Sequence, residues 1–237
     1  MTSFHLATVL TERSEQRRKI PKRTRTRYLI LAATAREMEK VGYDGLTIDN
    51  IVDEARLARG TFYLYFTNRS DVAAAVIRTY RALVLARRPR GGRELKAYDA
   101  ILRMNKYYVA TYAWNAPLLA GIETLVRNRP DQACSRDFWN NRWGLAVLSD
   151  ANRRSGAGTG SCDKRGLLAV RAVLAMADEF LREAFVYKSP TLTRLINNQE
   201  NNQENDLEVV AEVLSVVWYR SIYGSHPKGV EQILPLF

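Results

Sequence analysis

The sequence predicts an all-α protein in two parts, and three observations support this prediction. Apolar residues recur at steps of three and four along most of the chain, which is the spacing of one helical face. No segment as long as a β-strand shows the alternation of apolar and polar residues that is typical of a half-buried strand. Pro89, Gly91 and Gly92 interrupt the helical pattern, so we expect a boundary between residues 1–90 and 91–237.

The composition is that of an ordinary globular protein. Of the 237 residues, 46% are apolar and 26% are charged, which excludes wholesale disorder and small disulfide scaffolds. No run of about 18 uncharged apolar residues is present, which excludes a membrane span, and residues 1–10 lack the pattern of a secretory signal. Cys134, Cys162 and the two histidines show no metal-site spacing, so we expect a cytoplasmic protein without metal or cofactor.

The net charge of +11 lies mainly in the N-terminal part. Residues 1–90 hold 18 Lys and Arg against 9 Asp and Glu, whereas residues 91–237 hold 18 against 16. So dense a positive charge favours a polyanionic partner, with nucleic acid first and an anionic membrane surface second. A solvated, disordered tail is the alternative. The densest cluster consists of Arg17, Arg18, Lys19, Lys22, Arg23, Arg25 and Arg27.

The first part contains signals for four helices. Gly42 follows the first apolar stripe and is expected to end that helix as a left-handed cap. Thr47 is expected to cap the second helix, and Asn68 with Asp71 three residues later is expected to cap the fourth. The third is short and rich in aromatic residues. We expect these helices at about residues 28–41, 48–56, 59–66 and 68–88.

The second part is also expected to be helical, with two polar interruptions. The Gly- and Ser-rich residues 155–161 have the composition of a flexible connector. Residues 197–205, in which Asn-Asn-Gln-Glu occurs twice, form a polar insert that cannot bury a core. We expect helices at about residues 101–116, 118–126, 130–152, 163–187 and 206–223.

Two short helices joined by a tight turn and followed by a long helix are typical of a helix-turn-helix, whose second helix enters the major groove of DNA. At these residues the sequence resembles the tetracycline-repressor (TetR) family of bacterial one-component regulators. The resemblance covers about residues 24–72. It rests on Gly42-Tyr43, Leu46-Thr47-Ile48, Ile51-Val52, Ala55 and the run Arg59-Gly60-Thr61-Phe62-Tyr63-Leu64-Tyr65-Phe66-Thr67-Asn68-Arg69.

The resemblance implies which residues of the head contact DNA. Arg59 and Gly60 occupy the base-reading positions, where arginine binds guanine through two hydrogen bonds and glycine allows a close approach to the groove. Arg69 replaces a frequent lysine of the family that reaches the DNA backbone. Core packing is expected for Phe62 and Phe66. The implied phosphate contacts are Thr47, Thr61, Tyr63 and Tyr65, with core packing as the alternative for the two tyrosines.

Two residues in the turn depart from the family pattern. Arg56 stands where the family usually has glycine, and a left-handed conformation there would cost about 1–2 kcal/mol. Ala58 replaces the usual Ser or Thr cap of the recognition helix, which forfeits about 1 kcal/mol. The side chain of Arg56 offers a further phosphate contact in partial compensation.

The second part is expected to bind a small lipophilic or aromatic effector and to form a homodimer. Its aromatic residues exceed what a helical core needs, and large rings leave gaps that accept apolar ligands. We predict that the effector contacts Met104, Tyr108, Tyr112, Trp114, Phe138, Trp139, Trp143 and Phe180. The helices at 163–187 and 206–223 would expose an apolar strip in a monomer, which predicts a dimer interface at Val170, Leu174, Ala177, Leu181, Val210, Leu214 and Val217.

These observations predict a ligand-responsive transcriptional regulator, a repressor that binds a palindromic double-stranded operator as a dimer. The alternative is a basic helical enzyme or lipid-binding protein without sequence-specific DNA binding. Enzyme motifs such as Gly-x-Ser-x-Gly, the phosphate-binding loop and His-Glu-x-x-His are missing. A membrane-surface protein needs bulky apolar residues opposite its charges, and residues 12–27 have only Ile20 in that role. We therefore expect no enzyme and no membrane partner.

Overall fold

The computed structural model describes residues 3–16, 18–90, 92–128, 130–154, 156, 164–196, 203–224 and 228. The side chains of residues 127–136, 138, 139 and 203–205 are not described, although their helices are. Within the described residues every regular element is helical, and none is a strand. The all-α prediction is thus confirmed. The predicted connector at 155–161, apart from Gly156, and the polar insert up to residue 202 lie outside the described residues.

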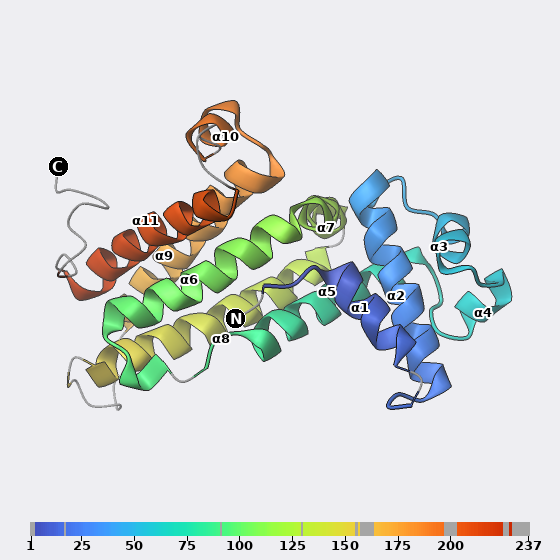
Figure 1. Ribbon diagram of the computed structural model, residues 1–237, viewed down its shortest axis with the longest axis horizontal. Coiled ribbons are helices and arrows are strands. Elements are labelled where there is room, and N and C mark those ends of the chain that lie inside the picture. The colour runs from blue at the N-terminus through green and yellow to red at the C-terminus, as the bar shows by residue number, and fades with distance from the viewer. Residues whose placement is uncertain are drawn as a thin grey trace. The chain divides into compact units, whose positions relative to one another are not determined.

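The chain forms two compact units, and the first, here called the head unit, comprises residues 2–87 and 114–132. Its helices are α1 (Leu6–Glu15), α2 (Lys22–Val41), α3 (Ile48–Ala55), α4 (Arg59–Tyr63), α5 (Arg69–Arg87) and α7 (Ala116–Asn128). The second unit comprises residues 88–113 and 133–237. It contains most of α6 (Ala97–Trp114) and α8 (Pro130–Arg154), with α9 (Lys164–Leu181), a π-helical turn (Arg182–Val186), α10 (Pro190–Ile196) and α11 (Gln203–Tyr223) (Figure 1).

Helix α2 is the central element of the head unit. Its inner face is buried, with Ile30, Leu31 and Met38 at most 1% exposed, and it packs against α1, α3, α5 and α7. The helix ends at Gly42, whose φ of 68° and ψ of −176° lie outside the αL region but in a positive-φ region that glycine adopts without strain. The Gly42 N–H donates to the Met38 carbonyl at 3.1 Å. The predicted helix end at Gly42 is confirmed, but the expected αL conformation is not found, because ψ is extended.

Helix α1 is an element that the sequence pattern does not predict. The first expected helix starts near residue 28, yet Leu6–Glu15 is helical and α2 already begins at Lys22. Leu6, Val9 and Leu10 recur at helical spacing and are at most 5% exposed. A helix of ten residues is marginal in isolation, so α1 depends on its packing against α2. Tertiary contacts, rather than local sequence signals, therefore specify this helix.

Helix α7 packs within the head unit although it lies beyond the boundary predicted near residue 90. A side chain at Gly121 would bring its Cβ within 3.2 Å of the Met38 carbonyl oxygen, so glycine permits α7 to approach α2 closely. Asn115, just before α7, is fully buried. It accepts a hydrogen bond from the Leu6 N–H at 2.8 Å and donates one to the Phe4 carbonyl at 2.7 Å. The start of α7 therefore holds the N-terminus of the chain.

The long helices of the second unit run roughly alongside one another (Figure 1), and α9 packs against α11. Asn105 of α6 donates to the Ser215 hydroxyl of α11 at 3.0 Å, and both side chains are buried. Tyr98 and Tyr219 join the same two helices with ring centroids 6.2 Å apart. A Cβ at Gly144 of α8 would lie 3.4 Å from Leu167 of α9, so these two helices also approach closely. The positions predicted for the long helices of this unit agree with the structure.

Candidate nucleic-acid interface

Helix α3 begins with the predicted cap. The Thr47 hydroxyl accepts a hydrogen bond from the Asn50 N–H at 3.1 Å, which satisfies one of the free N–H groups at the helix start. Thr47 also contacts the Asn50 side-chain oxygen. Ile51, Val52 and Ala55 are buried on the opposite side. Thr47 therefore combines a capping role with exposure to solvent at the positive end of α3, where phosphate binds favourably.

The turn between α3 and α4 has the strain that its sequence predicts. Arg56 has φ 51° and ψ 49°, the left-handed conformation, and is exposed. Ala58 is the N-cap of α4 and makes no side-chain capping bond. The turn is closed by the backbone, with the Leu57 N–H donating to the Val52 carbonyl at 2.9 Å and the Thr61 N–H donating to the Ala58 carbonyl at 2.8 Å.

Replacing Arg56 by glycine is expected to stabilise the protein by about 1 kcal/mol, since glycine removes the Cβ that makes the left-handed conformation costly. This gain should raise the midpoint of thermal unfolding by roughly 2–4 °C. Arg56→Ala is the matched control because it removes the guanidinium but keeps the Cβ. Calorimetry measures the stability of both variants. If Arg56→Gly and Arg56→Ala were equally stable, backbone strain at residue 56 would not be the cause of any gain in stability.

Helix α4 has one buried and one exposed face. Phe62 is fully buried and Phe66, which follows the helix, is 3% exposed, so their expected core packing is confirmed. Their ring centroids lie 5.9 Å apart. On the other face Tyr63 is 48% exposed, and Arg59 and Gly60 are also exposed. Thr61 and Tyr65 are half-buried, so each side chain can pack against the head and still contact a DNA phosphate.

Gly60 has open space around it. A Cβ placed there meets no heavy atom within 4 Å, and its φ is not in the left-handed region. Neither the packing of the head nor the backbone conformation therefore requires glycine at this position. Any requirement for glycine must come from something that approaches α4 from outside.

Arg59 is held by neighbours on the surface. Its guanidinium forms an ion pair with Asp49 of α3 at 2.7 Å, and both side chains are more than half exposed. The hydrogen bond with Tyr63 and the charge of Asp49 raise the pKa of the Arg59 guanidinium, so it stays charged. An exposed ion pair is worth at most about 1 kcal/mol. Arg59 can therefore leave Asp49 for a base or a phosphate at small cost.

The start of α5 confirms the predicted capping pair. The Asn68 side-chain oxygen accepts from the Asp71 N–H at 2.9 Å, and the Asp71 carboxylate accepts from the Thr67 N–H at 3.1 Å. Arg69 donates to the carbonyl of Leu46 at 3.0 Å, and its guanidinium lies 5.0 Å from the centroid of the Tyr43 ring. Arg69 thus supports the loop before α3. Its predicted contact with the DNA backbone is a separate role.

Charged residues also join α2 to α3. The Lys40 ammonium lies 2.7 Å from Glu37 and 3.0 Å from Glu54 of α3, and Arg36 lies 3.1 Å from Glu54. The hydrogen bond from Lys40 is the main cause that lowers the pKa of the Glu54 carboxyl, against the opposing effect of burial. The pKa of Lys40 is raised by its hydrogen bonds with Glu37 and then Glu54. These pairs fix the orientation of α3 on α2.

The predicted effector residues are distributed over both units. Tyr108 and Tyr112 of α6 have ring centroids 6.1 Å apart, and the Tyr108 hydroxyl lies 2.9 Å from Asp178 of α9. Trp114 is 59% exposed and belongs to the head unit. Tyr112 is buried, and Met104, Tyr108, Trp143 and Phe180 are half-buried. The side chains of Phe138, Trp139 and Cys134, with the whole of Cys162, lie outside the described residues.

Most of the predicted dimer residues form the core of a single chain. Leu174 and Val217 are half-buried. The expectation that the whole set would be exposed in a monomer is wrong, because these positions of α9 and α11 pack against the other helices of the second unit. Val170, Ala177, Leu181, Val210 and Leu214 are at most 5% exposed.

The exposed side of α9 carries apolar residues beside Arg165 and Glu179, and the sequence pattern does not reveal that these apolar residues are exposed. Leu168 is 60% and Met176 41% exposed, and Ala172 between them is also exposed. Val209 of α11 is 55% exposed. On α9 these residues are spaced by four, so they share one side of the helix, opposite the buried side. Because both sides are apolar, periodicity alone does not distinguish them.

The capped α3, the short α4 and the capped α5 form a helix-turn-helix head. Residues 30–76 match the model of the bacterial regulatory proteins of the tetR family. Over 52 residues the chain is 40% identical to an uncharacterised HTH-type transcriptional regulator in the lacX 3′ region of Lactococcus lactis subsp. lactis, a match that covers 22% of this chain and 26% of that protein. Over residues 30–76, the head of this chain is therefore similar to the tetR family of bacterial regulatory proteins.

Beyond the head, the fold of the chain is similar to that of two solved regulators. It matches a crystal structure described as a TetR-family transcriptional regulator from Mesorhizobium loti MAFF303099, with a TM-score of 0.58, 12% identity, and coverage of 84% of this chain and 98% of that one. It also matches the fatty acid degradation regulator FadR from Bacillus halodurans, with a TM-score of 0.53, 16% identity, and coverage of 84% and 97%. At these identities the likeness establishes the fold.

The described part of the chain has neither a membrane span nor a metal-ligand cluster. Among the described helices none is long and apolar enough to span a membrane. The described residues include no group of three or more His, Cys, Asp or Glu side chains placed to hold a metal ion.

Proposed function

We propose that this protein is a ligand-responsive transcriptional repressor that binds a palindromic operator as a homodimer. The observation that supports the proposal best is the exposed face of α4. It presents Arg59, Gly60 and Tyr63 to solvent on a base of buried Phe62 and Phe66. A short helix held this rigidly can enter the major groove, with Arg59 reading a base and the hydroxyls of Thr47 and Tyr65 holding phosphates.

The dimer would form through α9 and α11. Leu168, Ala172 and Met176 give α9 an apolar exposed face, and Val209 adds to the exposed apolar surface of α11. Small residues such as Ala172 let two helices approach closely, and a second copy of the chain offers the same face. This assignment keeps the predicted helices but replaces the predicted residues with those on the opposite side of α9.

The effector would bind among the aromatic residues of the second unit. Met104, Tyr108 and Tyr112 of α6 present a thioether and two aromatic rings, and Asp178 already engages the Tyr108 hydroxyl. Such a lining suits a lipophilic or aromatic molecule rather than a multivalent anion. Release from DNA requires that the effector favour one conformation over another, and a tenfold loss of operator affinity corresponds to about 1.4 kcal/mol of differential binding.

Selection from a pool of random duplexes tests the proposal. The protein is expected to enrich a palindrome whose half-sites lie about one helical turn apart, bound by two chains. Tyr65→Phe is expected to weaken binding to the selected duplex and to a random duplex by the same factor, with unchanged salt dependence, because no charge is lost. Enrichment of no sequence, or binding of a single chain per site, would contradict the proposal.

A further inference from the structure

A cluster of cations in the head unit has no carboxylate partner among the described residues. We call this cluster the basic turn, and it consists of Arg18, Lys19, Lys22 and Arg23, all exposed. None of the four forms an ion pair with any residue that the structure describes, whereas Arg36, Lys40 and Arg59 of the same unit all pair with carboxylates. The sequence places no acidic residue between Glu15 and Glu37. The basic turn is therefore a region of uncompensated positive charge.

The basic turn is held in a defined position. The Gln16 carbonyl accepts from the Lys19 N–H at 3.2 Å and from the Ile20 N–H at 3.1 Å, which closes the turn between α1 and α2. Helix α1 is fixed on α2 by its buried face, and Asn115 holds the backbone of Phe4 and Leu6. A merely solvated tail would need none of these contacts. The buried helix α1 thus carries the basic turn on a rigid support.

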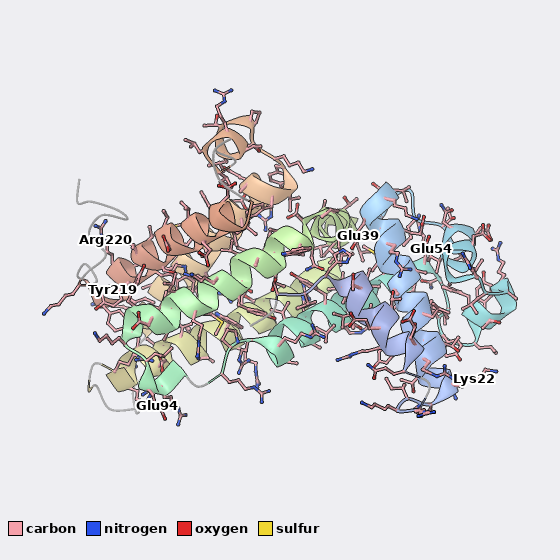
Figure 2. All side chains as sticks on the ribbon, in the orientation of Figure 1. Lys22, Glu39, Glu54, Glu94, Tyr219 and Arg220 are labelled. Atoms are coloured by element: carbon pink, nitrogen blue, oxygen red, sulfur yellow. The ribbon has the colours of Figure 1, made fainter. Side chains whose placement is uncertain are left out.

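The basic turn lies toward the recognition helix. The Arg27 guanidinium, near the start of α2, lies 5.2 Å from the centroid of the Phe66 ring, and Phe66 directly follows α4. Figure 2 shows Lys22 at the end of α2 that is nearer to α4 than to α3. The end of α2 that carries Lys22 and Arg23 therefore lies on the side of the head unit where α4 ends.

The local electrostatics of α2 favour an anion at this end. Pro21 is the N-cap of α2 and provides no side-chain cap, and the first turn contains no acidic residue. Lys22 and Arg23 instead place positive charge at the positive end of a 20-residue helix, an arrangement that destabilises the free protein. Phosphate groups would relieve this repulsion, and a polyanion would relieve it at several side chains together.

We propose that the basic turn is a second DNA-binding surface, which holds backbone phosphates beside the half-site that α4 reads and does so independently of base sequence. The proposal rests on the proposed function for the location of the duplex. Each phosphate that the turn neutralises releases condensed counterions, so its contribution is charge-dependent and falls with salt. The helix α1 then has a function in this protein, which is to position the turn.

The test replaces all four cations by glutamine in the full-length protein. We expect the variant R18Q/K19Q/K22Q/R23Q to bind the selected duplex and a random duplex at least about tenfold more weakly at 0.1 M salt. The slope of log affinity against log salt should become shallower by about 0.9 for each phosphate that the variant no longer neutralises. Thermal stability should be unchanged or higher, because the substitutions remove repulsion at the start of α2.

The matched control removes four exposed cations of the second unit, Arg93, Lys96, Arg142 and Arg194, by the same change to glutamine. Its affinity and salt slope should stay close to those of the unmodified protein. If the basic-turn variant behaves like this control while the unmodified protein binds its operator, the inference is overturned and the proposed function stands. If the unmodified protein selects no sequence, the proposed function fails, and binding to random duplex still decides the inference.

A third measurement uses vesicles of phosphatidylglycerol, because an anionic membrane surface is negatively charged like DNA. We expect the four substitutions to reduce DNA binding much more than vesicle binding. Unchanged DNA binding together with abolished vesicle binding would overturn the inference in favour of a membrane surface.

Discussion

Replacing Leu168 and Met176 by glutamate is expected to convert the protein to monomers and to lower operator affinity by about a hundredfold or more, since two linked heads bind with avidity that one head lacks. Both side chains are exposed in the single chain, so the substitutions should leave its fold intact. Sedimentation or size-exclusion chromatography measures the oligomeric state, and binding to the selected duplex measures the affinity.

The control for this result uses exposed apolar residues elsewhere. Leu145 of α8 and Leu195 of α10 are 40% and 72% exposed, and their joint replacement by glutamate should leave the dimer intact. Leu214→Glu gives a second contrast, because Leu214 is 5% exposed and a buried, unpaired carboxylate should unfold the unit rather than separate subunits. A dimer that survives the α9 substitutions would assign the interface to another face.

Replacing Arg59 by alanine is expected to cost about 1–3 kcal/mol on the operator, or roughly 5- to 150-fold in affinity, and to relax the preference at one base pair. The side chain is exposed and its ion pair with Asp49 contributes little to stability, so unfolding should not be the cause. Titration of the operator, of operators altered at single positions and of a random duplex measures both effects.

Two companion variants refine this test. Asp49→Asn removes the ion pair while keeping Arg59, so its operator affinity should not fall. Gly60→Ala adds a Cβ that meets nothing within the protein, and should weaken operator binding without loss of stability if the groove must approach α4 closely. Equal losses on operator and random duplex for Arg59→Ala would make Arg59 a backbone contact rather than a base-reading residue.

The sequence was sufficient for features that local chemistry decides. The helix end at Gly42, the Thr47 cap of α3 and the Asn68–Asp71 pair at α5 depend on residues a few positions apart. The same holds for the strained Arg56 and the uncapped start of α4 at Ala58, both expected from the residue types alone. The burial of Phe62 and Phe66 followed from their spacing in a short helix.

Only the tertiary structure decided features that depend on residues far apart in the chain. Helix α1 is too short to be stable by itself and exists through burial against α2 and the hydrogen bonds of Asn115, 109 and 111 residues away. The pairing of Arg59 with Asp49 depends on the angle between α3 and α4. On α9 both sides are apolar, so the sequence determined that a helix forms there, but only packing against the other helices determined which side is buried and which remains open to a partner.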